Sequence, residues 1–197
     1  MRVIILGSKG MLGKALQEEF KDSEVFAFDK DDIDITDGVI VKNKILEIKP
    51  EVIINATAIN AVDNIETDDN FYNLAQKVNG FAVGQLAKIC KDLNVILVHY
   101  SSDYVFAGDD KNGYNEESLV KPLNKYGETK ALGEKLLGEN TDKFYLIRLS
   151  RLFGPTGTSE MAKKSFVDII LDLVVNKGKT ELDLVDDEKS CPTYAPD

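Results

Sequence analysis

The sequence is poor in the residues that most often bind metals or form disulfides. Its 197 residues include 2 cysteines and 1 histidine, with no tryptophan. Cys90 and Cys191 lack the close spacing of a zinc or redox motif, so we expect two reduced thiols, as is usual in the cytoplasm. His99 stands at the end of an apolar run, where a structural role is the expectation. We therefore expect no metal site and no catalytic triad built on histidine.

Positive charge is also scarce. The chain has 24 Lys and Arg against 34 Asp and Glu, which gives a formal net charge of −10. Nucleic acids and anionic membranes need clustered basic side chains, so neither is an expected partner. Apolar runs such as residues 2–6 are too short to span a membrane, and we see no secretory signal. Because 43% of the residues are hydrophobic, the chain can bury a real core, and we expect a cytoplasmic protein.

Apolar runs alternate with stretches of helical periodicity. We expect strands at residues 2–6, 25–28, 52–54, 95–98, 144–147 and 181–185, and helices at 11–21, 37–48, 70–92, 125–139 and 162–176. On the third helix, the apolar side is expected to hold Leu74, Val78, Phe81, Leu86 and Ile89. Repeated strand–helix units predict an α/β fold of the Rossmann type, with a doubly wound parallel sheet and helices on both faces.

A glycine-rich loop follows the first predicted strand. Gly7, Gly10 and Gly13 have the spacing G-x-x-G-x-x-G and open the first predicted helix. Glycine permits a tight turn and a close backbone approach to a pyrophosphate, and the helix N-terminus offers free N–H groups to that anion. A plain turn is the alternative, but the strand before the loop and the helix after it favour nucleotide binding.

An acidic residue ends the second predicted strand. Asp29 stands where a carboxylate usually accepts hydrogen bonds from the adenosine ribose, which favours NAD over NADP. Lys9 and Lys30 keep NADP open, because either could meet a 2′-phosphate. Asp34 and Ile35 follow in the segment that lines the adenine in folds of this kind.

A tyrosine and a lysine are four residues apart at the start of a predicted helix. Tyr126 and Lys130 therefore share one helix face. Tyrosine has an ordinary pKa of about 10, and a nearby cation lowers it. Ser102 follows the fourth predicted strand, and its hydroxyl can donate to a carbonyl oxygen that gains charge. Such pairs also occur by chance, so a catalytic interpretation of this pair depends on the glycine loop upstream.

With these features in place, the chain resembles the dTDP-4-dehydrorhamnose reductases, which are extended short-chain dehydrogenases/reductases. The stretches that carry the resemblance are Asn55–Ala58, Ala61–Asp63 with Glu66, Ser101–Phe106, Tyr126–Lys130 and Ser190–Asp197. The resemblance covers essentially the whole chain. It implies that Ser102, Tyr126 and Lys130 are catalytic. It implies cofactor contacts from Gly10, Met11, Leu12, Asp29, Asp34, Ile35, Ala58, Ile59, Asn60, Tyr100, Tyr126 and Lys130, and sugar contacts from Ser102 and Asp103.

Two features depart from the family pattern. Arg151 stands where the family usually has a tryptophan at the sugar site, so Arg151 either meets an acidic sugar or phosphate or is simply exposed. Family members also continue past the position of Asp197. We therefore expect a dinucleotide-binding domain over residues 1–155, and over 156–197 a helix–strand segment leading into a substrate domain that is mostly absent. Such a chain should bind a dinucleotide but reduce the sugar poorly.

The resemblance implies an NAD(P)H-dependent reductase of a dTDP-4-keto-6-deoxy sugar. Hydride would pass from the nicotinamide to C4. Tyr126 would protonate the C4 oxygen, Ser102 would polarise it, and Lys130 would lower the pKa of Tyr126 and hold the ribose. The alternative is a dinucleotide-binding regulatory or assembly subunit without turnover, because fold alone does not settle function. The expected partners are the dTDP-sugar and a second copy of the chain.

Overall fold

Five parallel strands form the central sheet, in the order β2-β1-β3-β4-β5. The computed structural model describes residues 1–159 and 164–197. The strands are β1 (Arg2–Leu6), β2 (Glu24–Phe28), β3 (Val52–Asn55), β4 (Ile96–Ser102) and β5 (Phe144–Leu149). The expected doubly wound α/β architecture is confirmed, and the strand order reverses direction between β1 and β3.

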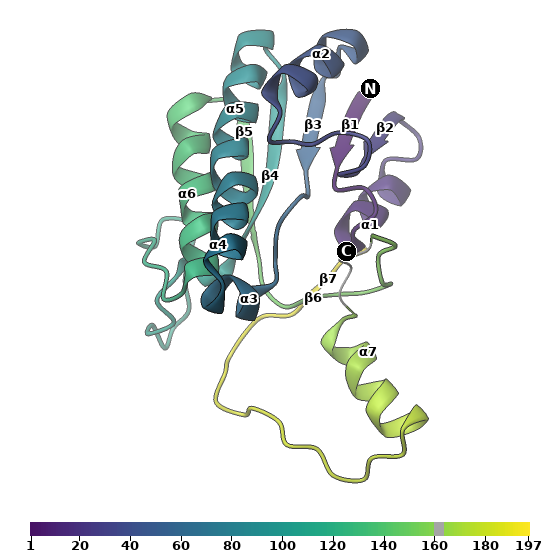
Figure 1. The fold of residues 1–197 in the computed structure, drawn as a ribbon, viewed down its shortest axis with the longest axis vertical. Helices are drawn as coiled ribbons and strands as arrows, with labels where there is room; N and C mark the ends of the chain where they lie inside the picture. Colours follow the sequence, from purple (N-terminus) through teal and green to yellow (C-terminus); the bar gives the residue numbers. More distant parts are fainter. Residues whose placement is uncertain (160–163) are drawn as a thin grey trace.

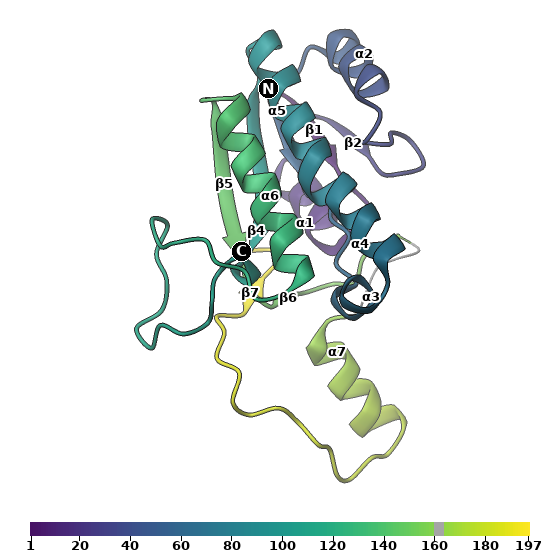
Figure 2. The same cartoon turned by 60° about the vertical axis from the view of Figure 1, so that its left-hand side comes forward.

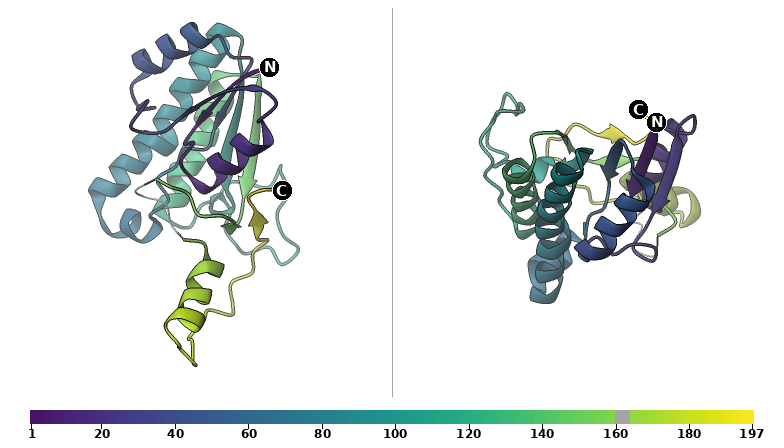
Figure 3. Two further views of the ribbon diagram at one scale, coloured as in Figure 1. Left: turned by 90° about the vertical axis from the view of Figure 1, so that its right-hand side faces the viewer. Right: turned by 90° about the horizontal axis from the view of Figure 1, so that it is seen from above.

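Helices cover both faces of this sheet. They are α1 (Met11–Glu19), α2 (Gly38–Ile48), α3 (Val62–Thr67), α4 (Asp69–Ala75), α5 (Ala82–Leu93), α6 (Lys125–Asn140) and α7 (Phe166–Leu171). Shorter helical segments are η1 (Gln76–Phe81), η2 (Asp103–Val105) and η3 (Asp172–Asn176). Figure 2 shows α5 and α6 side by side against the sheet, and Figure 3 shows α1 on the opposite face. Within the described part of the chain, no helix is both long and apolar enough to cross a membrane.

The core has a layer on each side of the sheet. Ile4, Ile53 and Leu97 pack with residues of α2, α5 and α6, whereas Val3 and Ile5 point to the other face, toward α1. Successive residues of a strand point to opposite faces, so burial on both sides requires an unbroken apolar run. The first five expected strands are such runs, and all five formed where predicted, although β4 continues to Ser102 and β5 to Leu149.

The third expected helix has a different apolar face from the one predicted. Leu74 and Phe81 are 38% and 57% exposed, so their placement in the core was wrong, while Leu86 and Ile89 are buried as predicted. The cause is η1, a π-helical segment between α4 and α5. Its wider turn shifts the helical phase, so Asn79 is fully buried while the predicted Val78 is partly buried against the core.

The C-terminal segment also differs from expectation. The predicted strand at 181–185 is wrong: Leu184 and Val185 are 55% and 71% exposed, and the segment is irregular. A short strand is stable only when another strand pairs with it, and no described strand lies along this one. A small second sheet forms instead, between β6 (Leu152–Phe153) and β7 (Thr193–Tyr194).

The last expected helix begins later than predicted. A capping box of Ser165 and Asp168 starts α7 at Phe166. These two residues lie within the expected range of 162–176 and mark the true start of the helix. Residues 162 and 163 of that range lie outside the described residues. Figure 1 shows that α7 and the irregular segment after it project from the end of the sheet where the strands terminate.

Candidate active site

The predicted site residues gather at the carboxyl edge of the sheet. Gly7 follows β1, Asp29 follows β2, and Ser101 and Ser102 end β4. The change of direction in strand order falls between β1 and β3, where such folds open a crevice for ligands. The topology therefore brings together residues that are far apart in the sequence.

The glycine loop is too tight for side chains at two of its positions. Gly7 has a φ of +80°, which favours glycine, and its N–H donates to the Phe28 carbonyl at 2.9 Å. A Cβ at Gly13 would lie 2.1 Å from the Gly7 carbonyl oxygen. Gly10 is the N-cap of α1, and no side chain among the described residues caps that helix. Its first amides can therefore bind an anion.

Asp29 is held by the turn around it. Its two carboxylate oxygens accept from the backbone N–H groups of Lys9 and Lys30, each at 2.9 Å. The Lys9 ammonium pairs with Asp31 at 2.8 Å, and that hydrogen bond lowers the pKa of the Asp31 carboxyl. Asp32 accepts the backbone N–H of Asp29. The turn after β2 is therefore more acidic than basic.

The other predicted cofactor residues lie along the same edge. Asp34 accepts hydrogen bonds from the backbone and the hydroxyl of Thr36, which lower the pKa of its carboxyl, while Ile35 is buried in the core. Met11 and Leu12 form the first turn of α1. Ala58, Ile59 and Asn60 occupy the loop after β3. Tyr100 lies on β4.

Asn79 is a buried polar residue that the sequence analysis missed. Its amide oxygen accepts from the Ile59 N–H at 2.8 Å, and its amide nitrogen donates to the Ile59 carbonyl at 2.9 Å and to the Thr129 hydroxyl at 3.0 Å. It thus joins the loop after β3 to the helix that carries Tyr126 and Lys130. The available signal was a polar residue inside an apolar helix, hidden by the phase shift of the π-helical segment.

Ser102, Tyr126 and Lys130 lie in one region of the structure, at the end of β4 and the start of α6. Each is nearly buried, at 8%, 8% and 1% exposure. The Ser102 side chain lies close enough to Tyr126 to act on the pKa of its phenol, which it lowers. The Lys130 ammonium donates to the Tyr100 carbonyl at 2.8 Å. The Tyr126 ring also meets Tyr104 edge-to-face, with ring centroids 5.5 Å apart.

Burial controls the ionisation of this group. It raises the pKa of Tyr126 to about 12, against a smaller opposing effect of the Ser102 side chain. It lowers the pKa of Lys130 to about 8. The expectation that Lys130 lowers the pKa of Tyr126 is not met in this structure, where burial raises that pKa and Lys130 is not among the groups that shift it. At neutral pH, Tyr126 is a protonated phenol and can donate its proton.

The predicted sugar residues lie beside this group. Asp103 accepts from the Ser102 hydroxyl at 3.1 Å and from the Ser150 hydroxyl, which comes from the turn after β5. Arg151 has a positive φ of 45° and pairs with Glu188 of the irregular C-terminal segment. Arg151 lies just after β5 and is exposed, with its guanidinium already engaged by that carboxylate.

A second missed feature lies over the glycine loop. The N–H of Thr158 donates to the Lys9 carbonyl at 2.7 Å, and a Cβ at Gly157 would lie 2.5 Å from that same oxygen. The backbone of residues 156–159 therefore packs directly on the loop. No local pattern announces this contact, because it joins residues about 150 positions apart, a separation that only the tertiary fold brings together.

These groups support one kind of chemistry. A buried phenol, a serine hydroxyl and an ammonium lie at the same edge as a glycine loop and a helix N-terminus that no side chain among the described residues caps. Such a set can hold a phosphate-containing cofactor and protonate an oxygen atom that gains charge during a reaction.

Known proteins share both the sequence and the fold. The family model described as the RmlD substrate binding domain matches residues 1–197. The dTDP-4-dehydrorhamnose reductase of Streptomyces griseus is 33% identical over all of this chain and 62% of its own length.

Two solved structures have the same fold. The dTDP-4-dehydrorhamnose reductase of Bacillus anthracis, in complex with NADP, has a TM-score of 0.89 and 35% identity over 98% of this chain. The Clostridium acetobutylicum ortholog has a TM-score of 0.90 and 33% identity over the whole chain. This chain spans 66% of each of those two proteins and 62% of the Streptomyces relative.

Proposed function

The chain belongs to the RmlD substrate binding domain family, and we propose that it works as a nicotinamide-dependent reductase of a dTDP-4-keto-6-deoxy sugar. The observation that carries the proposal is the gathering of the buried side chains of Ser102, Tyr126 and Lys130 at the edge that holds the glycine loop. The names of the relatives support the enzyme over the alternative, a dinucleotide-binding subunit without turnover. The substrate is the one on which those relatives are named as acting.

The residues present fit a dinucleotide. The close contact between Gly7 and Gly13 brings the backbone to the N-terminus of α1, where the uncapped amides suit a pyrophosphate. Asp29 is the group suited to the ribose hydroxyls. When bound, a nicotinamide cofactor supplies a hydride. We propose residues 1–155 as the part that holds the dinucleotide and residues 156–197 as the beginning of the part that meets the sugar.

The chain's own residues supply the proton and its environment. Tyr126 holds a proton at its hydroxyl and donates it to the sugar's carbonyl oxygen as that oxygen gains charge. The Ser102 hydroxyl, which donates to Asp103 in this structure, turns to donate its proton to the same oxygen when the sugar binds. Lys130 keeps a positive charge behind the site and holds the ribose. Asp103, fixed by Ser150, orients Ser102 and contacts the sugar.

We propose NAD(H) as the preferred cofactor. Asp29, Asp31 and Asp32 crowd the turn after β2, and the Lys9 ammonium is already paired with Asp31, so a 2′-phosphate meets net negative charge there. The Bacillus relative was crystallised with NADP, so NADPH is the necessary comparison. A homodimer and a cytoplasmic location remain predictions. Light scattering measures the oligomeric state, and cell fractionation measures the location.

The test compares wild type with Tyr126→Phe. NADH oxidation is followed with dTDP-4-keto-6-deoxyhexose made in situ, and NADH affinity is measured by calorimetry. The variant should lose about 10²–10⁴-fold in rate, the usual contribution of a general acid, with its NADH affinity almost unchanged. Activity within twofold of wild type would show that Tyr126 is not the acid. Wild-type NADH binding without any turnover would favour the subunit alternative.

A further inference from the structure

The helix pair α3–α4 lies directly over the start of α6, where Tyr126 is found. Ile65 of α3 and Ala75 of α4 are fully buried in one apolar cluster with Tyr126. The catalytic ring is therefore packed beneath this helix pair. Neither helix contributes one of the catalytic residues named above, so their influence on the reaction would act through position.

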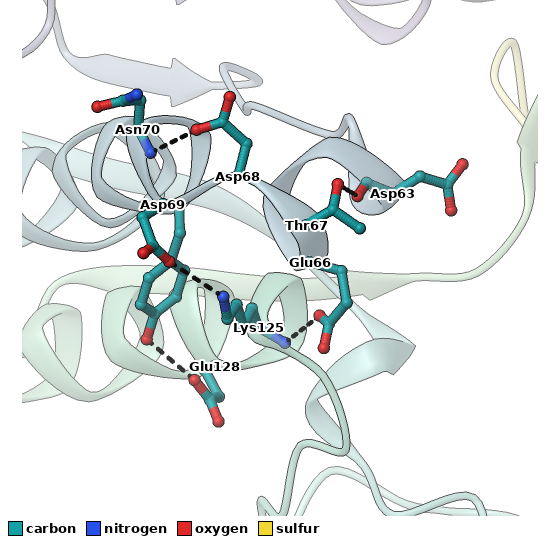
Figure 4. Close-up of polar contacts among 9 residues, drawn as sticks. Asp63, Glu66, Thr67, Asp68, Asp69, Asn70, Lys125 and Glu128 are labelled. Carbon is teal, nitrogen blue, oxygen red and sulfur yellow. Dashed lines mark hydrogen bonds and ion pairs between the residues drawn. The ribbon is translucent and has the colours of Figure 1, made fainter.

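Polar contacts join the same helix pair to the first turn of α6, as Figure 4 shows. The backbone N–H of Lys125 donates to Glu66 Oε2 at 3.0 Å, and the Lys125 ammonium pairs with Asp69 at 3.3 Å. The Tyr72 hydroxyl donates to Glu128 Oε2 at 3.0 Å. Lys125 and Glu128 stand on either side of Tyr126 in the sequence, so the turn is held before and after the catalytic residue.

The contact with Glu66 differs from the others because it binds the backbone. The first amides of a helix have no partner within the helix, and a carboxylate there also interacts favourably with the helix dipole. Asn124 caps the Gly127 N–H at 2.7 Å, and Glu66, from 59 positions earlier, takes the Lys125 N–H. A cap that comes from another element fixes where the helix begins relative to that element.

The opposite side of this turn has no room to move. A Cβ at Gly127 would lie 2.2 Å from the Tyr104 carbonyl oxygen, so α6 rests directly on η2. That segment follows Ser102, which caps it by accepting the Tyr104 N–H at 3.2 Å. The start of α6 is thus held between η2 on one side and Glu66 on the other.

We propose that Glu66 is a positioning residue: by accepting the Lys125 N–H, it sets the start of α6 and so holds the Tyr126 hydroxyl beside Ser102. The effect on turnover rests on the proposed function, whereas the effect on the Tyr126 ring does not. Glu66 is exposed, and exposed contacts stabilise weakly, so the expected loss is modest. A small displacement of an acid from its acceptor still lowers the rate, because proton transfer depends on geometry.

Three variants separate position from charge. Glu66→Ala removes the acceptor, and Glu66→Gln keeps an acceptor oxygen without the charge. Asp63→Ala removes the same charge one turn earlier on α3, where the carboxylate makes no hydrogen bond or ion pair with a described residue. In the NADH-oxidation assay, Glu66→Ala should lower kcat by roughly threefold to tenfold with KM for NADH within about twofold, and the other two variants should stay within about twofold. Equal losses in Glu66→Ala and Asp63→Ala, or no loss in Glu66→Ala, would overturn the proposal.

A second readout does not need turnover. Tyrosine labelled with ¹³C at Cζ reports each phenol by NMR, and Tyr126→Phe identifies the signal of Tyr126. Burial raises the pKa of Tyr126 to about 12, so a loosened ring in Glu66→Ala should titrate closer to the ordinary value of about 10. Glu66→Gln and Asp63→Ala should titrate as wild type does.

The two readouts together distinguish the outcomes. Suppose that neither the wild type nor any variant reduces the sugar, yet the Tyr126 signal moves in Glu66→Ala alone. The proposed function then fails and the positioning role stands. If the wild type is active and the Tyr126 signal does not move in Glu66→Ala, the positioning role fails whatever happens to kcat. A moved signal with unchanged kcat also overturns the proposal, because the position would then have no consequence for the reaction.

Discussion

Replacing Lys130 with methionine should make the chain more stable at neutral pH. Lys130 is 1% exposed, and burial lowers the pKa of its ammonium from 10.5 to about 8. A fall of this size corresponds to a cost of roughly 3 kcal/mol for keeping the charged form folded at pH 7. Methionine fills the same space without a charge. It leaves the Tyr100 carbonyl without its hydrogen bond, which costs about 1–2 kcal/mol. The net expectation is a gain of roughly 1–2 kcal/mol in the free energy of unfolding.

The pH dependence carries the sharper signature. The folded pKa of Lys130 lies below its unfolded value, so the penalty is fully present below about pH 8 and disappears as the pH rises toward 10.5. Wild type should therefore gain stability over this range, and Lys130→Met should not. The advantage of the variant at pH 7 should fall to zero or below by about pH 10. Tyr126 has a raised pKa, so it costs both proteins stability only above about pH 10, and its contribution largely cancels in the difference.

Urea unfolding followed by circular dichroism at pH 7, 8.5 and 10 measures both effects. Lys135→Met is the matched control, since Lys135 lies on the same helix with its side chain 70% exposed, and its stability should not change. Two results would refute the reasoning. One is that Lys130→Met is less stable than wild type by about 1 kcal/mol or more at pH 7, and the other is that the stability difference does not vary with pH. If Lys130 holds the ribose as proposed, the gain in stability should come with a loss of NADH affinity.

Two further predictions concern the glycine loop and the acidic turn after β2. Gly13→Ala should weaken NADH binding at least tenfold and destabilise the fold by about 1–3 kcal/mol, because its Cβ would lie 2.1 Å from the Gly7 carbonyl oxygen. Gly138→Ala on α6, where a Cβ meets nothing within 4 Å, should do neither, and thermal unfolding with calorimetry separates the two. Asp31→Asn should release the Lys9 ammonium and raise NADPH affinity relative to NADH by several-fold, measured by calorimetry, with the exposed Asp22→Asn as control. An unchanged NADPH-to-NADH ratio would show that the Lys9–Asp31 pair does not set the preference.

Local patterns account for the parts of the fold that could be predicted. The strand at residues 2–6 and the loop at Gly7 depend on burial on both faces of a sheet and on a left-handed turn, and both leave a signature in consecutive residues. The proposed catalytic set could be named from the sequence because Ser102 ends a strand and Tyr126 and Lys130 are four residues apart on one helix face.

Long-range packing accounts for the rest. One π-helical segment around Asn79 moved Leu74 and Phe81 out of the core, and no neighbouring residue signals that shift. Residues 181–185 alternate like a strand, but pairing depends on whether another strand's edge lies beside them. The direction of the pKa change at Tyr126 depends on how deeply the ring is buried, which a helical spacing of Tyr and Lys does not specify.

Transfer of deuterium tests the central claim most directly. The chain is incubated with NADH carrying deuterium at both C4 positions and with dTDP-4-keto-6-deoxyhexose, and the sugar nucleotide is analysed by mass spectrometry. Product accumulates over hours, so even slow turnover is detected. The account predicts a reduced sugar with one deuterium at C4 in wild type and almost none in Tyr126→Phe. Tight NADH binding with no deuterium in the sugar would contradict it and leave a dinucleotide-binding subunit in its place.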